Sequence, residues 1–175
     1  MSSAKNSGGG IESEAEAELR RLVPKKRLDS NLVRLGKAIR AYERDRYREA
    51  VTFLRPIVRD FPDAWSAHEL LGLCLYREGK WKGAISELET VADVTGSMDQ
   101  HPVIADCYRA LGQYRRAKEV WNELRQSSPA PEVLAEARIV YSGVLMDQGK
   151  EQDALELLKP HGKNLRAPKP FHIRQ

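Results

Sequence analysis

Apolar side chains recur every three or four positions along most of the chain, as they do on one face of an α-helix. Leu32, Leu35 and Ile39 show this spacing in the first long segment. Glycine or proline interrupts the pattern at short intervals, and Val, Ile and Thr are scattered rather than alternating with polar residues. The pattern therefore predicts an all-α protein built from many short helices.

The interruptions divide residues 29–160 into four predicted helix pairs, each with a tight turn between its helices. The expected helices span residues 29–45 and 47–61, 63–79 and 81–94, 101–112 and 114–127, and 131–149 and 151–160. Gly79 and Gly149 are expected to supply the left-handed backbone that two of these turns need. A further short helix is predicted at 11–23, after a Gly/Ser-rich tail at 1–10 that we expect to be disordered.

Side chains at the helix ends make more specific predictions. Asp29 or Ser30 is expected to cap the first long helix, and Asp63 the start of the second pair. Pro102 suits the first turn of a helix, whereas Pro56 is expected to kink the helix that contains it. The first helix of the first pair is expected to run slightly long, through residues 43–46, because the step from its glycine to the next alanine is two residues longer than in the second pair.

One short phrase occurs twice, 33 residues apart. The chain reads LYREGKWKGA at 75–84 and YRALGQYRRA at 108–117, so that glycine, an aromatic residue and alanine coincide. The alanine recurs in all four pairs at spacings of 34, 33 and 37 residues, as Ala50, Ala84, Ala117 and Ala154. Helix pairs that repeat at about this period predict a helical repeat protein.

Several further positions recur with the alanine. They are Leu35, Gly36, Ile39, Tyr47, Leu54 and Pro62 in the first pair; Leu71, Gly72, Leu75, Gly79, Trp81 and Leu88 in the second; Ala105, Tyr108, Gly112, Tyr114, Trp121 and Pro129 in the third; and Ser142, Leu145, Gly149 and Leu158 in the fourth. On these residues the chain resembles the tetratricopeptide repeat family, in the form found in bacterial cytosolic proteins. A small residue such as Gly72 or Ser142 is expected where the two helices of a pair approach most closely.

The resemblance implies an α-solenoid of antiparallel helix pairs wound into a right-handed superhelix. The pairs would span about 29–62, 63–96, 97–129 and 130–160, after an N-terminal helix and linker at 11–28. Residues 161–175 would be a tail or the start of a further repeat. The apolar face of the last helix would then be uncovered, which makes a homodimer through the C-terminal end possible.

In this family the first helix of each pair lines a concave groove, which binds a protein or peptide. Helix phase predicts which side chains face it: Lys37, Arg40, Glu69, Tyr76, Arg77, Asp106, Arg109, Ile139, Met146 and Asp147. Tyrosine and methionine offer adaptable apolar contacts. These residues suit an extended peptide or a partner helix, so we expect a protein-binding scaffold or adaptor.

Charge leaves a second function open. Residues 20–59 carry 13 Lys or Arg and 4 Asp or Glu, a balance of +9 in a chain whose net charge is +4. A basic segment of this kind could bind nucleic acid. The chain lacks a recognised nucleic-acid motif, however, and charges on helices usually face water. We therefore treat nucleic-acid binding through 20–59 as the alternative to the scaffold.

Reactive residues do not point to an enzyme. Cys74 and Cys107 lie 33 residues apart, as do His68 and His101, so each pair occupies one position of the repeat. We interpret them as packing residues and the cysteines as free thiols. No nucleophile and base, phosphate loop or metal-ligand spacing stands out, so no cofactor is expected. The longest apolar run, at 70–76, is too short for a membrane helix, and we expect a cytoplasmic protein.

Overall fold

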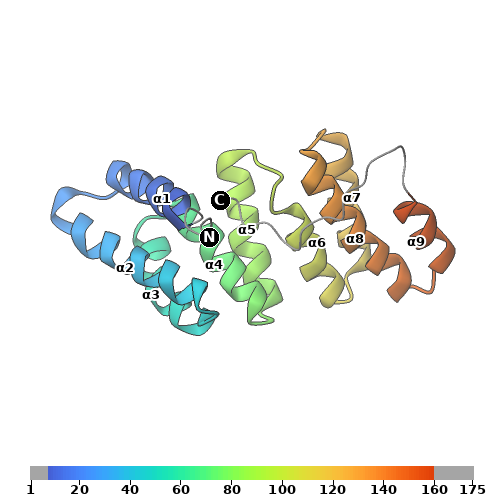
Figure 1. Cartoon of the computed structure of the whole chain (residues 1–175), viewed down its shortest axis with the longest axis horizontal. Helices are drawn as coiled ribbons and strands as arrows, with labels where there is room; N and C mark the ends of the chain where they lie inside the picture. Colours follow the sequence, from blue (N-terminus) through green and yellow to red (C-terminus); the bar gives the residue numbers. More distant parts are fainter. Residues whose placement is uncertain (1–7, 160–175) are drawn as a thin grey trace, which may run out of the picture. The chain divides into compact units, whose positions relative to one another are not determined.

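The computed structural model describes residues 8–159, and these residues fold into nine α-helices (Figure 1). The helices are α1 (Gly8–Leu22), α2 (Lys25–Glu43), α3 (Tyr47–Asp60), α4 (Trp65–Arg77), α5 (Trp81–Thr95), α6 (His101–Ala110), α7 (Tyr114–Gln126), α8 (Pro131–Asp147) and α9 (Glu151–Leu158). The predicted all-α fold of antiparallel helix pairs is confirmed. The chain divides into two compact units, and the helices up to α5 form the first while α6 to α9 form the second.

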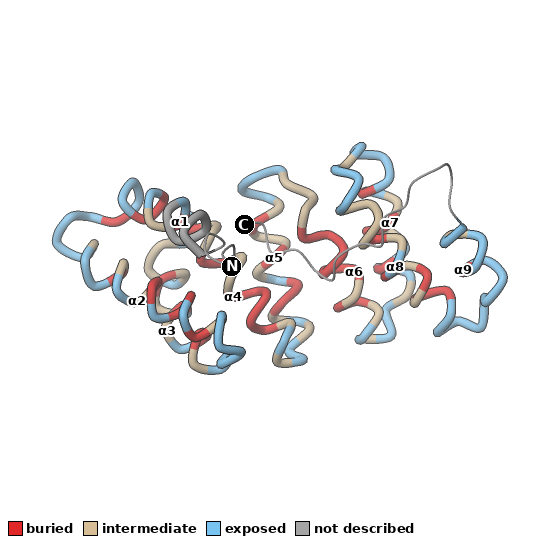
Figure 2. The backbone as a smooth tube through the Cα atoms, viewed as in Figure 1, coloured by how far each residue is buried: buried red, intermediate tan, exposed pale blue. Residues whose placement is uncertain are grey.

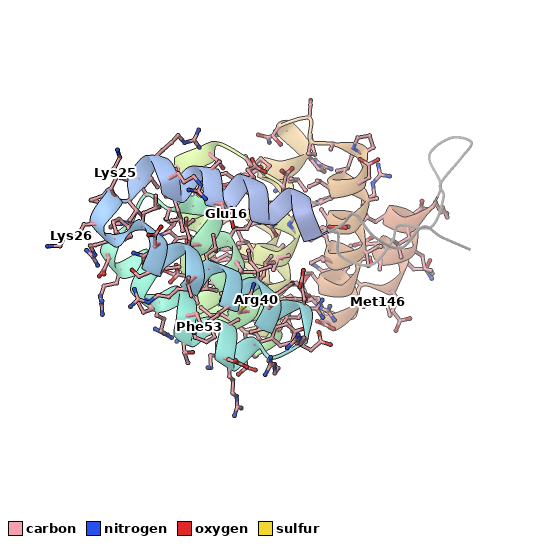
Figure 3. All side chains as sticks on the ribbon, turned by 60° about the vertical axis from the view of Figure 1, so that its left-hand side comes forward. Glu16, Lys25, Lys26, Arg40, Phe53 and Met146 are labelled. Carbon is pink, nitrogen blue, oxygen red and sulfur yellow. The ribbon has the colours of Figure 1, made fainter. Side chains whose placement is uncertain are left out.

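The first unit contains two of the predicted pairs and the N-terminal helix. α2 packs against α3, α3 against α4, and α4 against α5. α1 packs on α2 and also reaches α4. Figures 1 and 3 both show α1 along one side of α2, with α3 on the other side.

The second unit contains the other two pairs. α6 packs against α7, α7 against α8, and α8 against α9, and α6 also packs directly on α8. In both units the buried positions recur along the helices in short runs separated by exposed residues (Figure 2). This is the burial pattern that the apolar periodicity of the sequence predicts.

The four turns inside the pairs have the same geometry. Gly79, Gly112 and Gly149 have positive φ angles of 69°, 69° and 72°, and Asp45 takes the same place in the first pair with φ of 57°. In each turn the next backbone N–H donates to the carbonyl five residues back, as from Arg46 to Ala41 at 2.8 Å. This hydrogen bond closes a helix in the manner of a Schellman motif. We call Asp45, Gly79, Gly112 and Gly149 the turn residues.

Counting back from the turn residues corrects the register of the first pair. The expected extension of this helix through residues 43–46 is wrong, because α2 ends at Glu43 and residues 44–46 form the turn. The position seven residues before the turn residue, which we call the small column, is always small and buried. It holds Ala38, Gly72, Ala105 and Ser142, and each lies twelve residues before the recurring alanine.

The sequence-based alignment placed Gly36 in the small column, and this placement is wrong. A Cβ atom on Gly72 would lie 2.7 Å from both Cγ and Cδ2 of Leu88, which is closer than side chains pack. A Cβ atom on Gly36 would meet only the flexible end of Arg40, at 3.2 Å. The close approach of the helices thus requires a small residue at Gly72, and Ala38 is its counterpart in the first pair.

Two predicted caps are wrong. α2 begins at Lys25, directly after Pro24, because this proline ends one helix and is compatible with the start of the next. Asp29 and Ser30 consequently lie inside α2. α4 begins at Trp65, and no side chain caps it from the preceding residue, so Asp63 does not act as its N-cap.

The remaining helix-end predictions have mixed outcomes. Pro102 lies in the first turn of α6, as expected. The bounds of α3 run through Pro56 without interruption. α1 begins at Gly8, inside the segment 1–10 that was expected to be disordered. Residues 1–7 of that segment, and the predicted tail or further repeat at 161–175, lie outside the described residues.

Candidate functional site

In the corrected register, two positions of the first helices are buried in most of the later pairs but exposed in the first pair. The position five residues before the turn residue is buried in three pairs, as Cys74, Cys107 and Val144, whereas Arg40 in the first pair is exposed. The position eight residues before it holds Leu71 and Ile104, both buried, but Lys37 in the first pair is exposed. We call these two positions the stacking columns.

Lys37 and Arg40 thus occupy the stacking columns, whose residues are buried in the second and third pairs. Val33, which shares their face of α2, is 54% exposed, whereas its counterpart Ala67 is 1% exposed. Figure 3 shows the Arg40 side chain on α2. The sequence-based phase was two residues off in the first pair only, and the counterpart of Tyr76 there is Tyr42, which the prediction missed.

Tyr42 and Tyr76 belong to an aromatic cluster at the turn end of the first unit. Tyr42 meets Tyr47 edge to face, with ring centroids 5.5 Å apart, and Tyr76 meets Trp81 in the same way at 5.6 Å. The Arg77 guanidinium lies 5.9 Å from the centroid of Tyr47 and thereby joins the two pairs of rings. We call these five residues the aromatic edge. The predicted groove residues Tyr76 and Arg77 both lie in it.

The electrostatics of the aromatic edge keep the phenols of Tyr42 and Tyr47 protonated. Burial raises the pKa of Tyr42 to about 12, although the nearby Arg77 acts in the opposite direction. The Tyr47 hydroxyl donates a hydrogen bond to Asp45 over 2.5 Å, and this bond raises the pKa of Tyr47. The aromatic edge therefore presents flat apolar rings beside one exposed guanidinium, a combination suited to a peptide that carries an acceptor.

In the second unit the predicted groove residues form an ion cluster. Arg109 donates from Nε to Asp147 over 2.7 Å and from Nη1 to Asp106 over 3.3 Å. A Cβ atom on Gly143 would lie 2.8 Å from Cζ of Arg109, so the guanidinium rests directly on the backbone of α8. The hydrogen bond to Asp147 is the main cause of the raised pKa of Arg109. The sequence analysis did not predict this contact of Gly143 with Arg109, and the repeat position of the neighbouring Ser142 does not indicate it.

Apolar side chains accompany this ion cluster. Ile139 and Met146, both on α8, are 50% and 52% exposed, and Figure 3 shows Met146 projecting from its helix. Exposed aliphatic and thioether groups next to a neutralised ion cluster can contact apolar side chains of a partner. Glu69, the remaining predicted residue, is half-buried on α4 in the first unit.

The two repeat-related histidines are packing residues, as predicted, and both are buried. His68 Nδ1 lies 2.5 Å from Glu87 Oε2, and His68 Nε2 lies 3.0 Å from the carbonyl oxygen of Pro62. Both ring nitrogens thus face acceptors, which favours the imidazolium form. The hydrogen bond with Glu87 is the main cause of a raised pKa of His68.

This pair should make stability depend on pH. Because the folded pKa of His68 lies above its unfolded value of about 6.5, the stabilisation is complete below about pH 6.5 and is lost as pH rises through the folded pKa. We expect urea denaturation to show a falling free energy of unfolding across this range. The decline should be smaller in His68→Gln, which keeps a hydrogen-bonding side chain but does not titrate. Identical pH profiles of the two proteins would contradict this role of His68.

The cysteines are free and buried in the structure. Burial raises the pKa of both Cys74 and Cys107 to about 12, so neither is a thiolate at neutral pH. Among residues 8–159 no three or more His, Cys, Asp or Glu side chains gather in a way that could hold a metal ion. Within the same residues, every helix is too short or too polar to cross a membrane.

The basic segment 20–59 is partly neutralised by ion pairs. Arg48 donates to Glu78 over 2.8 Å, and Arg46 lies 3.0 Å from Glu49. The arginines of this segment that form ion pairs are Arg20, Arg27, Arg46, Arg48 and Arg59. Arg27 and Arg59 share Asp60, so four carboxylates weaken the positive field that a phosphate backbone would require.

Comparisons with known proteins agree with the helix pairs. Two family models described as tetratricopeptide repeat match residues 35–97 and 104–130, which together make up about half of the chain. The solved structure named MamA MSR-1 C2 is 19% identical, covers 86% of this chain and 85% of its own, and superposes with a TM-score of 0.63. For MamA AMB-1 P212121 the identity is 18%, the coverages are 86% and 81%, and the TM-score is 0.64. No curated protein sequence matches the chain.

Proposed function

We propose that the chain, which is a tetratricopeptide repeat protein, is a non-catalytic cytoplasmic adaptor that binds an extended peptide or a partner helix on the exposed face of its first helices. Such repeats imply a protein-binding scaffold in general. The observation that carries the finer proposal is the aromatic edge, in which two consecutive turns repeat one edge-to-face pair around Arg77.

The composition of the aromatic edge supports binding of a peptide. Tyrosine, tryptophan and arginine are the residues most enriched among those that dominate protein interfaces. Tyr42, Tyr47, Tyr76 and Trp81 are already held in place by one another, so they lose little conformational freedom when a ligand binds. Arg77 is exposed and can pair with a carboxylate or a peptide carbonyl oxygen.

The second unit adds a different kind of surface to the proposal. Arg109 is already paired with two carboxylates, so we do not assign it the capture of an acidic ligand group. Ile139 and Met146 instead offer apolar contact. The predicted groove residues of this unit would therefore bind apolar side chains, while those of the first unit bind aromatic, apolar and acidic ones.

Disrupting the aromatic edge should weaken partner binding. We expect Tyr76→Ala/Arg77→Glu to weaken binding by about tenfold or more, because truncated interface centres usually cost over about 1 kcal/mol each. Partners would first be captured from a lysate of the source cell after nuclease treatment, and their affinity would then be measured for each variant. Lys25→Glu/Lys26→Glu, which reverses two exposed charges of the basic segment, is the matched control and should bind as the unaltered chain does.

Each variant must keep its helical circular dichroism and its melting midpoint for the comparison to count. A folded Tyr76→Ala/Arg77→Glu protein that retains the same partners at the same affinity would rule out the aromatic edge as the binding surface. If the bound material disappears with nuclease and depends on Lys25 and Lys26 instead, the chain binds nucleic acid. Affinity should then also fall steeply with salt.

A further inference from the structure

The N-terminal helix covers part of the surface that the first helices present. α1 packs on α2 and α4, which are the first helices of the two pairs in this unit. It lies on the side of α2 opposite to α3, as Figures 1 and 3 show. In a helical repeat, the side of a first helix that faces away from the second helices is the side on which ligands bind. α1 is therefore placed where a ligand helix would lie.

Equivalent positions in the first and fourth pairs differ as this placement requires. Leu35 on α2 lies ten residues before its turn residue and is 1% exposed, whereas Ile139 at the same position on α8 is 50% exposed. Six residues before the turn residue, Ile39 and Leu73 are both buried in the first unit, whereas Gly143 is only half-buried in the second. The first unit thus has an apolar strip on its first helices, and this strip is shielded from solvent in the unit that contains α1.

α1 offers this strip one narrow face. Ala15 and Leu19 on α1, and Val23 directly after its last residue, recur at a spacing of four residues, and all three are buried. Arg20 and Arg21, on the other side of the helix, are exposed. The apolar side chains on α1 are small or medium in size, so the strip on α2 and α4 accepts a slender amphipathic helix.

A carboxylate on the same face makes a specific contact. Glu18 is 3% exposed, and its Oε2 accepts a hydrogen bond from the backbone N–H of Ser66 over 3.1 Å. Ser66 lies in the first turn of α4, whose start has no side-chain cap of its own. Glu18 therefore caps α4 from 48 residues away, where the helix dipole favours a negative charge.

This contact is incomplete. The second oxygen of Glu18, Oε1, is buried and has no hydrogen-bond partner among the described residues. A buried acceptor without a donor opposes burial of the group that carries it. From residue 14 on, where its side chains are described, α1 is held by few apolar side chains and by a carboxylate that is satisfied on one side only. A ligand with a better-matched acidic group would compete with it.

We propose that the surface of α2 and α4 beneath α1 is a binding site for an acidic amphipathic helix of a partner protein, and that α1 occupies this site until the partner displaces it. The partner helix carries a carboxylate at the position of Glu18, directed at the N–H of Ser66, and apolar residues at the positions of Ala15, Leu19 and Val23. This inference rests on the proposed function and names the class of partner that the first unit takes.

The probe is a labelled synthetic peptide with the sequence of residues 8–24, added to the full-length chain. The variant Leu19→Asp, which places a charge at a buried position, is expected to loosen α1 and changes no residue of α2 or α4. We expect the peptide to bind this variant at least about tenfold more tightly than the unaltered chain, because the site is open in a larger fraction of molecules. Arg21→Asp, which adds a charge on the exposed side of α1, is the matched control and should bind the peptide as weakly as the unaltered chain.

The second comparison is between the peptide and a version of it with Glu18→Lys. A peptide with Glu18→Lys should not bind the Leu19→Asp variant, because it would place a positive charge at the start of α4. Equal binding of both peptides, or no peptide binding to a folded Leu19→Asp chain, would overturn the proposal. Sedimentation of the unaltered chain as a dimer that exchanges α1 would also overturn it, since the site would then belong to a second copy.

Failure of this inference can be told apart from failure of the proposed function. Ser66 and Arg77 lie at opposite ends of α4, so Tyr76→Ala/Arg77→Glu should leave binding of the peptide to the Leu19→Asp variant unchanged. If captured partners depend on Tyr76 and Arg77 but bind the Leu19→Asp variant no better than the unaltered chain, the aromatic edge is the binding surface and the site beneath α1 is not used. If the Leu19→Asp variant binds partners more tightly, the site beneath α1 is supported.

Discussion

Replacing Gly72 by leucine is expected to destabilise the first unit by about 1–3 kcal/mol, the usual cost of forcing extra methylenes into a packed core. Even a Cβ atom at this position would lie 2.7 Å from two atoms of Leu88. Leu88 is fully buried and cannot move aside without disturbing α5. The melting midpoint and the free energy of unfolding in urea should both fall, and the loss of protection from hydrogen exchange should concentrate in α4 and α5.

Gly36 provides the matched control, since it is also a helical glycine but meets only the end of a flexible side chain. Gly36→Ala should be neutral or slightly stabilising, because alanine in a helix interior is favoured over glycine by about 0.5–1 kcal/mol. Gly72→Ala should destabilise the same protein. If both alanine variants had the same melting midpoint, the assignment of Gly72 to the small column would be wrong.

Replacing Trp121 by alanine should be the most damaging single truncation in the second unit, at about 3–5 kcal/mol. Trp121 is 5% exposed and stacks on Tyr141, with ring centroids 5.3 Å apart and planes inclined by 13°. It also packs beside Leu124 and Ala137, so it holds α7 against α8. The truncation would leave a cavity that these neighbours cannot close, because they belong to two separate helices.

Hydrogen exchange resolved along the chain is the suitable measurement, since the two units are compact bodies of their own. Protection should fall in α6 to α9 and change little in α2 to α5. Trp121→Phe keeps an aromatic ring against Tyr141 and should lose much less stability. A Trp121→Ala protein with unchanged protection in α7 and α8 would show that the stacked pair does not hold these helices together.

The periodic parts of the fold were accessible from the sequence because each repeat carries the same signal. The recurring alanine indicated the pairing of helices, and Gly79 and Gly149 marked two of the four turns, where both have positive φ. Gly112, which coincides with Gly79 in the repeated phrase, has the same φ in a third turn. The turn residue of the first pair was missed because Asp45, not a glycine, has the positive φ there. A non-glycine residue rarely adopts a positive φ. The constant step of twelve residues from the small column to the alanine was the signal that could have placed Ala38.

The candidate site was predictable only as far as it follows the repeat. Helix phase in the second and third pairs agrees with the turn residues, so Tyr76, Arg77 and Arg109 stay predicted groove residues, whereas the register of the first pair left out Tyr42. The contact of Glu18 with Ser66 could not be found by periodicity, because α1 lies outside the repeats and the two residues are 48 positions apart. Long-range contacts of this kind depend on the packing of whole helices and have no local sequence pattern.

The two buried thiols can report local opening of the structure, one in each unit. Cys74 lies in the first unit and Cys107 in the second, each deep in a stacking column. Since burial raises the pKa of both thiols to about 12, a disulfide reagent at neutral pH reacts with either one only after the surrounding helices part. The labelling rate of each cysteine therefore reports the opening equilibrium of its own half of the chain, with no foreign group introduced.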